Sequence, residues 1–424
     1  MDAGARRLRD FIMHYVIIGA GPAGVTAAEA IRQGDPGGAI SLIGDEPEAP
    51  YSRMAIPYLL TGQIDEAGTH LRPAVDHYAR LGIDTLSGCR VTNIDPLGHQ
   101  LSLDDGRRRG FDRLLIATGS HPSRPPIDGL DLPGVHHCWT LDDARRIAAL
   151  AKPGAKVVLM GAGFVGTIVL EALARRRVAL TVVEMGDRMV PRMMDDIAGT
   201  MLKRWCESRG VAVRTSTRIV GIDAQAPSLG VRLEGGETLP ADLVVVSTGV
   251  RPNLDFLAGS GIATAEGVLV DDHLQTNMPG IYAAGDVCQS ADMVSGAAEV
   301  HAIQPTAAEH GRVAAANMVG NDLPFIGSLN MNVLDTLGLV STSFGHWQGN
   351  GGSSVRHQDG WRYLRLEFDH AEDRLIGAQT VGLTEHVGVL RGLIQSKRRL
   401  GPWKDILMSH PEQFMQGYVA TVGV

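Results

Sequence analysis

The pattern Gly-x-Gly-x-x-Gly occurs twice in this 424-residue chain, at residues 19–24 and again at residues 161–166. Each copy follows an apolar, β-favouring stretch, residues 15–18 and 156–160, and opens a stretch typical of a helix. In such a strand–turn–helix unit the first glycine permits the tight turn, and the second lets the backbone approach a pyrophosphate. The third glycine lets the helix pack close to the strand, with the phosphate charge at the helix N-terminus. Two copies predict two bound dinucleotides and suggest electron transfer between them.

Charge and hydropathy argue against nucleic-acid and membrane partners. The formal net charge is −8, and the arginine runs at residues 107–109 and 175–177 are short. No apolar run reaches the ~18–20 residues that a membrane span needs. Residues 1–13 are charged and lack the apolar core of a signal peptide. We therefore expect a cytoplasmic protein that binds neither nucleic acid nor a membrane.

The cysteines and histidines form no recognisable metal or redox motif. Cys89, Cys138, Cys206 and Cys288 are scattered, with no C-x-x-C or C-x4-C spacing. The fifteen histidines show no H-x-x-x-H or H-E-x-x-H pairing. We therefore expect no metal site and no local redox disulfide.

An acidic residue follows the second strand of each unit, where this fold binds an adenosine ribose. Asp45 and Glu46 follow the strand at residues 40–43, and the sequence leaves open which of them reaches the ribose. Glu184 follows the corresponding strand of the second unit. A carboxylate there accepts hydrogen bonds from a 2′-hydroxyl and repels a 2′-phosphate, which favours NADH over NADPH. Arg188 lies nearby in the sequence, so the use of NADPH stays open.

Each unit also has a later apolar strand that ends in the dipeptide Thr-Gly. The first ends in Thr118 and Gly119, and the second ends in Thr248 and Gly249. This internal repeat indicates two related dinucleotide-binding units. A further strand ends at Asp286, and a carboxylate at a strand–helix junction is well placed to hold ligand hydroxyls or phosphate.

With both fingerprints, both Thr-Gly strand ends and Asp286 in this order, nearly the whole chain resembles the FAD-dependent pyridine nucleotide-disulfide oxidoreductase superfamily. Similar members are the ferredoxin and rubredoxin reductases, the flavoprotein part of NADH-dependent nitrite reductase, and NADH oxidase or coenzyme A-disulfide reductase. The resemblance implies that the first fingerprint binds FAD and the second binds NADH. It also implies that the C-terminal domain packs over the flavin and mediates a homodimer.

The expected fold class is therefore α/β, with two Rossmann-like dinucleotide-binding domains of the glutathione-reductase type and a C-terminal α+β domain. Residues 1–120 and 250–325 would form the FAD-binding domain and residues 121–249 the NAD-binding domain. Residues 326–424, where shorter alternating strands begin, would form the α+β dimerisation domain.

The residues expected to bind the cofactors belong to these motifs or lie close to them. For FAD they are Gly19, Gly21, Pro22, Ala23, Gly24, Asp45, Glu46, Arg53, Thr118, Gly119, Asp286 and Gln304. For NADH they are Gly161, Gly163, Phe164, Val165, Gly166, Glu184 and Gly249. Gln304 falls where relatives often cover the flavin with an aromatic side chain. It could hydrogen-bond the flavin pyrimidine edge or simply begin a helix.

The segment at residues 50–58 runs beside the flavin in this superfamily, and here it departs from the better-known relatives. Disulfide reductases and NADH oxidases carry a redox cysteine where this chain has Met54, and a thioether cannot form a mixed disulfide or a sulfenate. Ferredoxin reductases pair a lysine with a glutamate near the flavin N5. Tyr58 and Ile168 stand at those two positions here, so both partners are replaced together. Losing only one would leave a buried charge unpaired, at a cost of several kcal/mol.

The expected reaction begins with hydride transfer from NADH to FAD, for which the protein supplies positioning and no acid or base is required. We therefore name no catalytic residue, although Arg53 and Tyr58 are candidates for the flavin-facing surface. The expected acceptor is a small redox protein such as a ferredoxin or rubredoxin. Three alternatives remain open: an NADH-linked subunit of a larger complex resembling phenylglyoxylate dehydrogenase, an NADH oxidase, and a non-enzymatic flavin-binding redox sensor.

Overall fold

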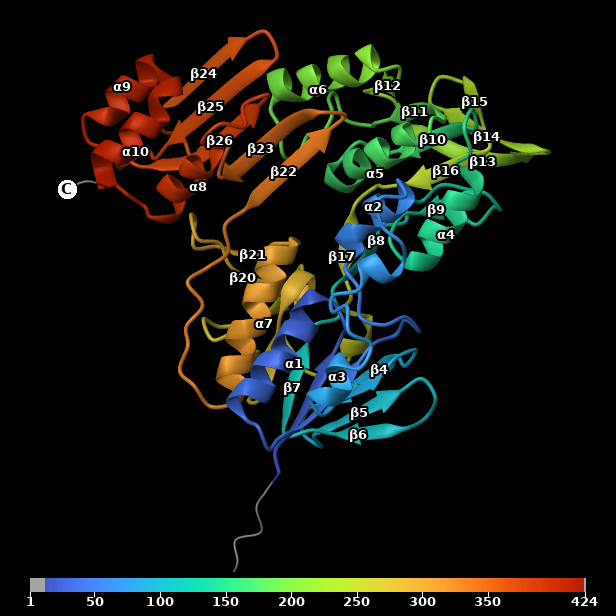
Figure 1. The fold of residues 1–424 in the computed structure, drawn as a ribbon, viewed down its shortest axis with the longest axis vertical. Helices are drawn as coiled ribbons and strands as arrows, with labels where there is room; N and C mark the ends of the chain where they lie inside the picture. The colour runs from blue at the N-terminus through green and yellow to red at the C-terminus, as the bar shows by residue number, and fades with distance from the viewer. Residues whose placement is uncertain (1–11, 423–424) are drawn as a thin grey trace, which may run out of the picture.

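The computed structural model describes residues 12–422, which form three units (Figure 1). The unit at the bottom of the view contains the first fingerprint, and the unit at the upper right contains the second. The C-terminal strands and helices form the unit at the upper left. Residues 1–11, on which most of the expectation about a signal peptide rests, lie outside the described residues.

The first unit is built on a parallel five-stranded sheet with the order β19-β7-β1-β2-β3. The central strand β1 pairs in unbroken register with β2 and β7, and all of it except His14 is buried. Helices α1 and α7 pack against each other, so closely that a Cβ atom at Gly311 would overlap the carbonyl oxygen of Ala23. The elements of this sheet and its helices are β1 (His14–Ile18), α1 (Pro22–Gly34), β2 (Ala39–Ile43), α3 (His77–Arg80), β3 (Ile83–Leu86), β7 (Arg113–Ile116), β19 (Ile281–Ala283) and α7 (Gln304–Met318).

Two small sheets complete this unit, one antiparallel and one mixed. One, of order β4-β5-β6, contributes Val91, Ile94, Leu101 and Leu103 to the same core as β1. The other, of order β18-β20-β21, precedes α7. Their strands are β4 (Val91–Asp95), β5 (Gln100–Leu103), β6 (Arg108–Gly110), β18 (Val268–Leu269), β20 (Cys288–Ala291) and β21 (Ala298–Val300).

The second unit repeats the plan with a parallel sheet of order β12-β11-β10-β16-β9. Its helix α4 begins with a capping box, in which the Thr140 hydroxyl and the Asp143 carboxylate each accept the other's backbone N–H. The elements are β9 (Val135–His137), α4 (Leu141–Leu150), β10 (Lys156–Met160), α5 (Phe164–Arg175), β11 (Ala179–Val183), α6 (Asp196–Ser208), β12 (Ala212–Arg214) and β16 (Leu243–Val246), with an antiparallel sheet of β13 (Ile219–Gln225), β14 (Ser228–Leu233) and β15 (Thr238–Ala241).

Two antiparallel strands, β8 (Ser120–Pro122) and β17 (Val250–Pro252), connect the first two units. The side chain of Asn253 donates to the carbonyl oxygen of Thr118 at 2.7 Å, which fastens the two crossings side by side. Because each crossing starts at a Thr-Gly strand end, the repeated dipeptide marks the places where the chain leaves one unit for the other.

The C-terminal unit is an antiparallel sheet of order β22-β23-β26-β25-β24 with three helices. Asp195, which caps α6 of the second unit, accepts hydrogen bonds from Tyr363 and Arg365 of β25, so these two units are joined through a buried carboxylate. The elements are β22 (Met331–Thr336), β23 (Leu339–Gly345), β24 (Ser354–Asp359), β25 (Arg362–Phe368), β26 (Leu375–Val381), α8 (Val387–Gln395), α9 (Trp403–Ser409) and α10 (Phe414–Val422).

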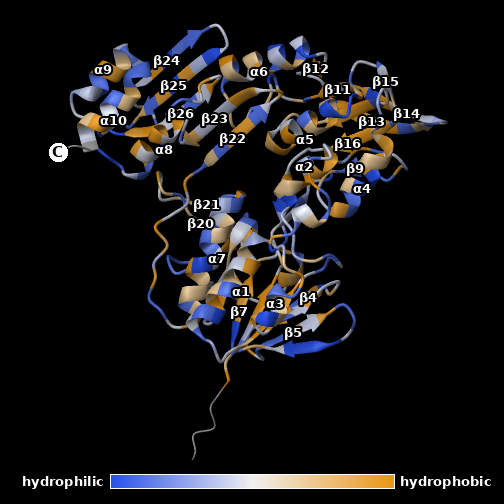
Figure 2. Ribbon diagram, viewed as in Figure 1, coloured by the Kyte–Doolittle hydropathy of each residue, from blue (hydrophilic) through white to orange (hydrophobic). Residues whose placement is uncertain are grey.

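The expected fold class is confirmed: two parallel-sheet units and a C-terminal α+β unit are present. In Figure 2 the strands of both parallel sheets are mostly hydrophobic, as strands covered on both faces should be. The expected domain boundaries stay predictions; the two five-stranded parallel sheets and the C-terminal sheet each lie within an expected range, whereas β8 crosses the boundary at residues 120 and 121. Across residues 12–422, none of the helices combines the length and apolar character that crossing a membrane requires.

Candidate functional site

The three glycines of the first loop have different surroundings: two of them pack against backbone atoms, and the third faces open space. A Cβ atom at Gly19, whose φ is +112°, would overlap the carbonyl oxygen of Ala117, and one at Gly24 would overlap that of Gly19. A Cβ atom at Gly21 would meet nothing within 4 Å. Gly21 is also the N-cap of α1 and makes no side-chain cap bond, so the backbone N–H groups of the first turn face open space. This cradle fits a pyrophosphate.

The second glycine loop has the same geometry. Gly161 has a φ of +100°, and its Cβ position is blocked by the carbonyl oxygen of Ser247, while that of Gly166 is blocked by the carbonyl oxygen of Gly161. Gly163, the N-cap of α5, has nothing within 4 Å of its Cβ position. Both fingerprints therefore present an open helix N-terminus.

A cavity of about 500 Å³ begins at the first glycine loop and extends toward α5 and β22. The 3-10 turn at Arg53–Ala55, helix α2 (Ile56–Leu60), the start of α7 and the Thr-Gly crossing also line it. The expected FAD-binding residues in its wall are Gly19, Gly21, Pro22, Ala23, Asp45, Glu46, Arg53, Thr118, Gly119, Asp286 and Gln304. Gly24 lies behind the loop. Phe164 and Val165, expected to contact NADH, line the same cavity, which therefore reaches from the first glycine loop to the start of α5.

Glu46, and not Asp45, takes part in a hydrogen-bond network in the cavity wall. Its carboxylate accepts from Arg53 at 2.6 Å and from the Tyr51 hydroxyl at 2.6 Å. Arg53 also donates to the carbonyl oxygen of Trp139 at 2.8 Å. Asp45 instead pairs with exposed Arg90 at 3.1 Å. Glu46 and Arg53 thus form an ion pair in the cavity wall, whereas Asp45 pairs with a residue outside it.

Asp286 lies deeper in the cavity wall, in the 3-10 turn at Gly285–Val287. Its carboxylate accepts from the Ser120 hydroxyl at 2.9 Å. Burial raises the pKa of Asp286 above its ordinary value, and the Ser120 hydrogen bond and the Arg53 charge offset this in part. Gln304, the first residue of α7, accepts from the Ser52 hydroxyl at 2.6 Å. A polyhydroxyl chain running along this wall would find hydrogen-bond partners on both sides.

The wall beside α5 and β22 is apolar. Met54, Ile168, Met331 and Val333 line it, and Met54 is 47% exposed. Ile168 therefore does face the cavity, as its alignment with a flavin-side glutamate predicts. Tyr58, on α2, is 55% exposed and lies outside the cavity wall.

Cys138 also lines the cavity, which the sequence gave no reason to expect. Burial raises the pKa of its thiol to about 12, so the thiolate needed for attack on a disulfide or peroxide is scarce at neutral pH. All four cysteines are free.

Glu184 holds the second glycine loop. Its buried carboxylate accepts from the backbone N–H of Ala162 at 2.6 Å and from that of Gly186 at 2.7 Å. Gly249 has a φ of +104° and lies at the crossing between the two units. Arg188 is engaged elsewhere: it donates to the carbonyl oxygen of Met194 and pairs with Asp187 at 2.7 Å.

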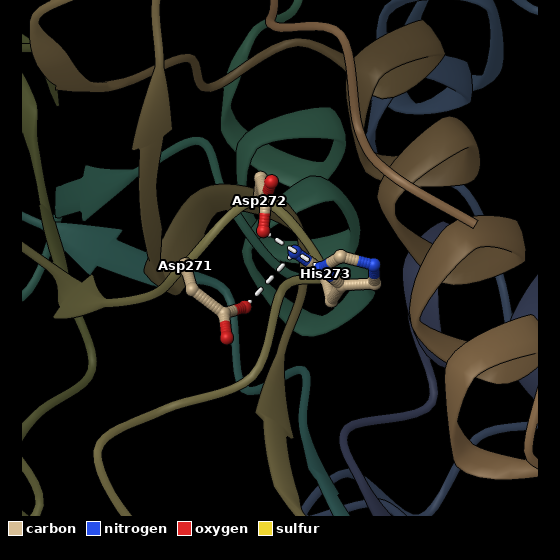
Figure 3. Close-up of side chains that lie close together, drawn as sticks. All are labelled: Asp271, Asp272 and His273. Carbon is tan, nitrogen blue, oxygen red and sulfur yellow. Dashed lines mark hydrogen bonds and ion pairs between the residues drawn. The ribbon is translucent and has the colours of Figure 1, made fainter. Parts of the chain in front are cut away.

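Two groups among the described residues have side chains of metal-ligating type. In the exposed group, His273 Nδ1 hydrogen-bonds Asp272 at 2.7 Å (Figure 3). Its Nε2 hydrogen-bonds Asp322, also at 2.7 Å. Asp271 accepts the backbone N–H groups of His273 and Gln275. Both ring nitrogens are thus engaged, and the group stabilises a turn. The second group, around Asp292, is buried.

Several cavity residues were not predicted from the sequence. Ser120 directly follows a Thr-Gly strand end and Tyr51 lies in the flavin-side segment, so both were within reach of motif reasoning. Trp139, Met331 and Val333 come from elements far away in sequence. No local pattern could have placed them here.

The first glycine loop opens into the cavity, and helix α5, which begins at the second glycine loop, lines the same cavity; this arrangement suits a reductase that binds two dinucleotides. Comparison with known proteins identifies the family: residues 13–310 match the pyridine nucleotide-disulphide oxidoreductase model. The chain belongs to this FAD-dependent family and is an NAD(P)H oxidoreductase that uses FAD, which confirms the resemblance inferred from the motifs.

Relatives and solved structures match almost the full length. The chain is 31% identical over 402 residues to NADH-dependent phenylglyoxylate dehydrogenase subunit epsilon of Aromatoleum evansii, covering 94% of this chain and 95% of the relative. It is 30% identical over 404 residues to the ferredoxin–NAD(+) reductase component of the p-cumate 2,3-dioxygenase system of Pseudomonas putida, covering 92% and 95%. The structure of an NAD-dependent persulfide reductase from A. fulgidus superposes with a TM-score of 0.85 at 28% identity, covering 92% and 78%.

Proposed function

We propose that this protein takes hydride from NADH and passes the electrons, through FAD, to a small redox protein such as a ferredoxin or rubredoxin. The observation that carries this proposal is the apolar wall of Met54, Ile168, Met331 and Val333 at the cavity. It offers neither a redox thiol nor a charged proton donor, as reduction of a disulfide or peroxide would need. One-electron transfer to a docked carrier needs neither.

The residues that line the cavity fit FAD. Gly21 and the first turn of α1 would hold the pyrophosphate, with Arg53 as its counter-charge and Glu46 toward the ribose. Asp286 and Ser120 would hold the hydroxyl-bearing chain, and Gln304 would face the ring end. Bound FAD supplies a centre that takes two electrons at once and releases them singly.

NADH is preferred over NADPH in this proposal. Glu184 is buried and held by two backbone N–H groups, so its charge is fixed beside the second cradle, where it would repel a 2′-phosphate. Arg188 is occupied by Met194 and Asp187 and offers no free cation in compensation.

The acceptor is tested by NADH-dependent cytochrome c reduction with and without added ferredoxin or rubredoxin. We expect at least one carrier to stimulate the rate severalfold. If the flavin is reduced by NADH but no carrier of this class stimulates the rate, the proposed acceptor is wrong.

A second candidate is the NADH-linked subunit of a larger oxidoreductase. The match to subunit epsilon, at 31% identity over 94% of this chain, favours it. Purification from the native host tests it: co-purification of stoichiometric partner subunits would support this candidate, and isolation of the chain as a homodimer would contradict it.

A further inference from the structure

Asp292 is a buried carboxylate that binds two histidines from different units. It is 1% exposed and lies directly after β20. Oδ2 accepts from His301 Nε2 at 3.1 Å, and Oδ1 lies 3.2 Å from His346 Nε2. Oδ1 also accepts the backbone N–H groups of Val294 and Ser295, which fixes the carboxylate in its turn.

Each histidine is attached to one wall of the cavity. His301 immediately precedes the segment 302–304, all three residues of which line the cavity. His346 immediately follows Gly345, whose backbone N–H donates to the carbonyl oxygen of Asn330 at 2.8 Å. Met331, which follows Asn330 in the chain, lines the cavity from the C-terminal unit.

We propose that Asp292 is a positioning residue that clamps the two walls at the flavin end of the cavity, holding segment 302–304 through His301 and strand β22 through His346. This role rests on the proposed placement of FAD. Its consequence is that the distance between the walls, and so the alignment of the two nucleotides, depends on a carboxylate that touches neither of them.

A third histidine, His310, connects the clamp to the turn that contains Asp286. His310, on α7, accepts the backbone N–H of Gly285 through Nδ1 at 3.2 Å, and its Nε2 lies 3.2 Å from the Ser290 hydroxyl and 3.4 Å from that of Ser328. Burial, with the nearby His301 charge, lowers the pKa of His310 to about 3, so it stays neutral. Ser328 pairs with Asp292 in a β-bridge, which connects the clamp to the cofactor-facing turn.

Nε2 of each histidine contacts Asp292, whereas Nδ1 of His301 is buried and has no hydrogen-bond partner among the described residues. The two histidines contact different oxygens of Asp292, and Oδ1 is already occupied by the turn. Glu299, also close, is half-buried on β21 and contributes charge near His346.

The test compares Asp292→Asn with Asp271→Asn by anaerobic stopped-flow, measuring flavin reduction at saturating NADH, the NADH Kd and the visible circular dichroism of the flavin. Asp271 is a matched control because it also accepts two backbone N–H groups in a turn, but it is exposed and away from the cavity. We expect Asp292→Asn to slow reduction on the order of tenfold, to change the flavin dichroism and to leave the NADH Kd within about twofold. Asp271→Asn should match wild type.

Reduction within twofold of wild type with an unchanged flavin spectrum would overturn the proposal. Zinc or another divalent metal found in the purified protein and lost in Asp292→Asn would also overturn it, because a metal site would replace the clamp. If Asp292→Asn does not fold, the half-buried His346 is replaced instead. His346→Gln removes the contact between Asp292 and the end of strand β23, and the same measurements then test the proposal. Failure of wild-type flavin to be reduced would contradict the proposed function instead, and the dichroism would still decide the clamp.

Discussion

Single glycines perform separable tasks in each dinucleotide loop. Gly24 and Gly166 have no room for a side chain because backbone carbonyl oxygens occupy their Cβ positions. Gly21 and Gly163 are in extended backbone that any residue adopts, and their Cβ positions are open. Gly24 and Gly166 are therefore required by the fold, and we propose that Gly21 and Gly163 are required by the ligands.

Gly21→Ala is accordingly expected to fold with a wild-type Tm while its FAD Kd rises tenfold or more, about 1.4 kcal/mol. Gly163→Ala should keep FAD and lose NADH affinity. Gly24→Ala should lose stability by ~2 kcal/mol or more, because its methyl group overlaps backbone. Thermal unfolding with flavin absorbance separates these outcomes. Normal FAD content in Gly21→Ala would contradict the assignment of the first cradle.

We expect Glu184 to determine the preference for NADH over NADPH. Glu184→Gln should raise the NADH KM about tenfold, as loss of a charged hydrogen-bond acceptor costs ~1.5–3 kcal/mol, and should narrow the preference over NADPH. Arg188→Ala is the control, because Arg188 is engaged by Met194 and Asp187. A large loss of NADPH activity in Arg188→Ala would show instead that Arg188 binds a 2′-phosphate. Steady-state kinetics with both nucleotides gives the answer.

At the scale of elements, we expect the clamp at Asp292 to stabilise the folded protein over a limited range of pH. Although burial opposes it, the hydrogen bonds from His301 and His346 hold the pKa of Asp292 well below its ordinary 3.8, and Asp292 in turn raises that of His346 above 6.5. The carboxylate contribution is therefore complete above pH 3.8 and lost as pH falls through the lowered pKa. The His346 contribution is complete below pH 6.5 and lost as pH rises through the raised pKa.

The Tm difference between wild type and Asp292→Asn should thus be largest between about pH 4 and 6.5 and should shrink toward pH 9. Thermal unfolding across this range measures it. A difference that grows with pH above 6.5 would contradict the ionic role of His346.

Elements with their own sequence signal were predictable. Residues 15–18, 40–43 and 156–160 could be predicted as strands because an apolar β-favouring run meets a glycine turn or an acid, and all three are strands in the structure. The acid and glycine positions followed from the same local chemistry. The choice between Asp45 and Glu46 did not, because it depends on Arg53 and Tyr51 folding back onto Glu46.

The contribution of the C-terminal unit to the cavity could not be predicted either. Met331, Val333 and His346 reach the cavity or its clamp only through the packing of β22 and β23 against the first two units. No periodicity or motif encodes that approach. Cys138 is likewise isolated in the sequence, and it reaches the cavity wall because it directly follows β9 of the second parallel sheet.

For the whole molecule, the three units meet around one cavity, and Asp195 and Asp292 tie the C-terminal unit to each of the other two. We propose, from the family resemblance, that the C-terminal unit also forms a homodimer. Light scattering should then give about twice the 45.2 kDa chain mass, and a monomer at micromolar concentration would contradict it.

The central claim is that electrons enter from NADH at one glycine cradle and reach FAD at the other. Anaerobic stopped-flow mixing of the flavin-loaded protein with one equivalent of NADH tests it most directly. We expect rapid bleaching of the flavin absorbance band, with NADPH at least about tenfold slower because Glu184 repels its 2′-phosphate. A flavin band that stays oxidised in the presence of NADH would contradict the account.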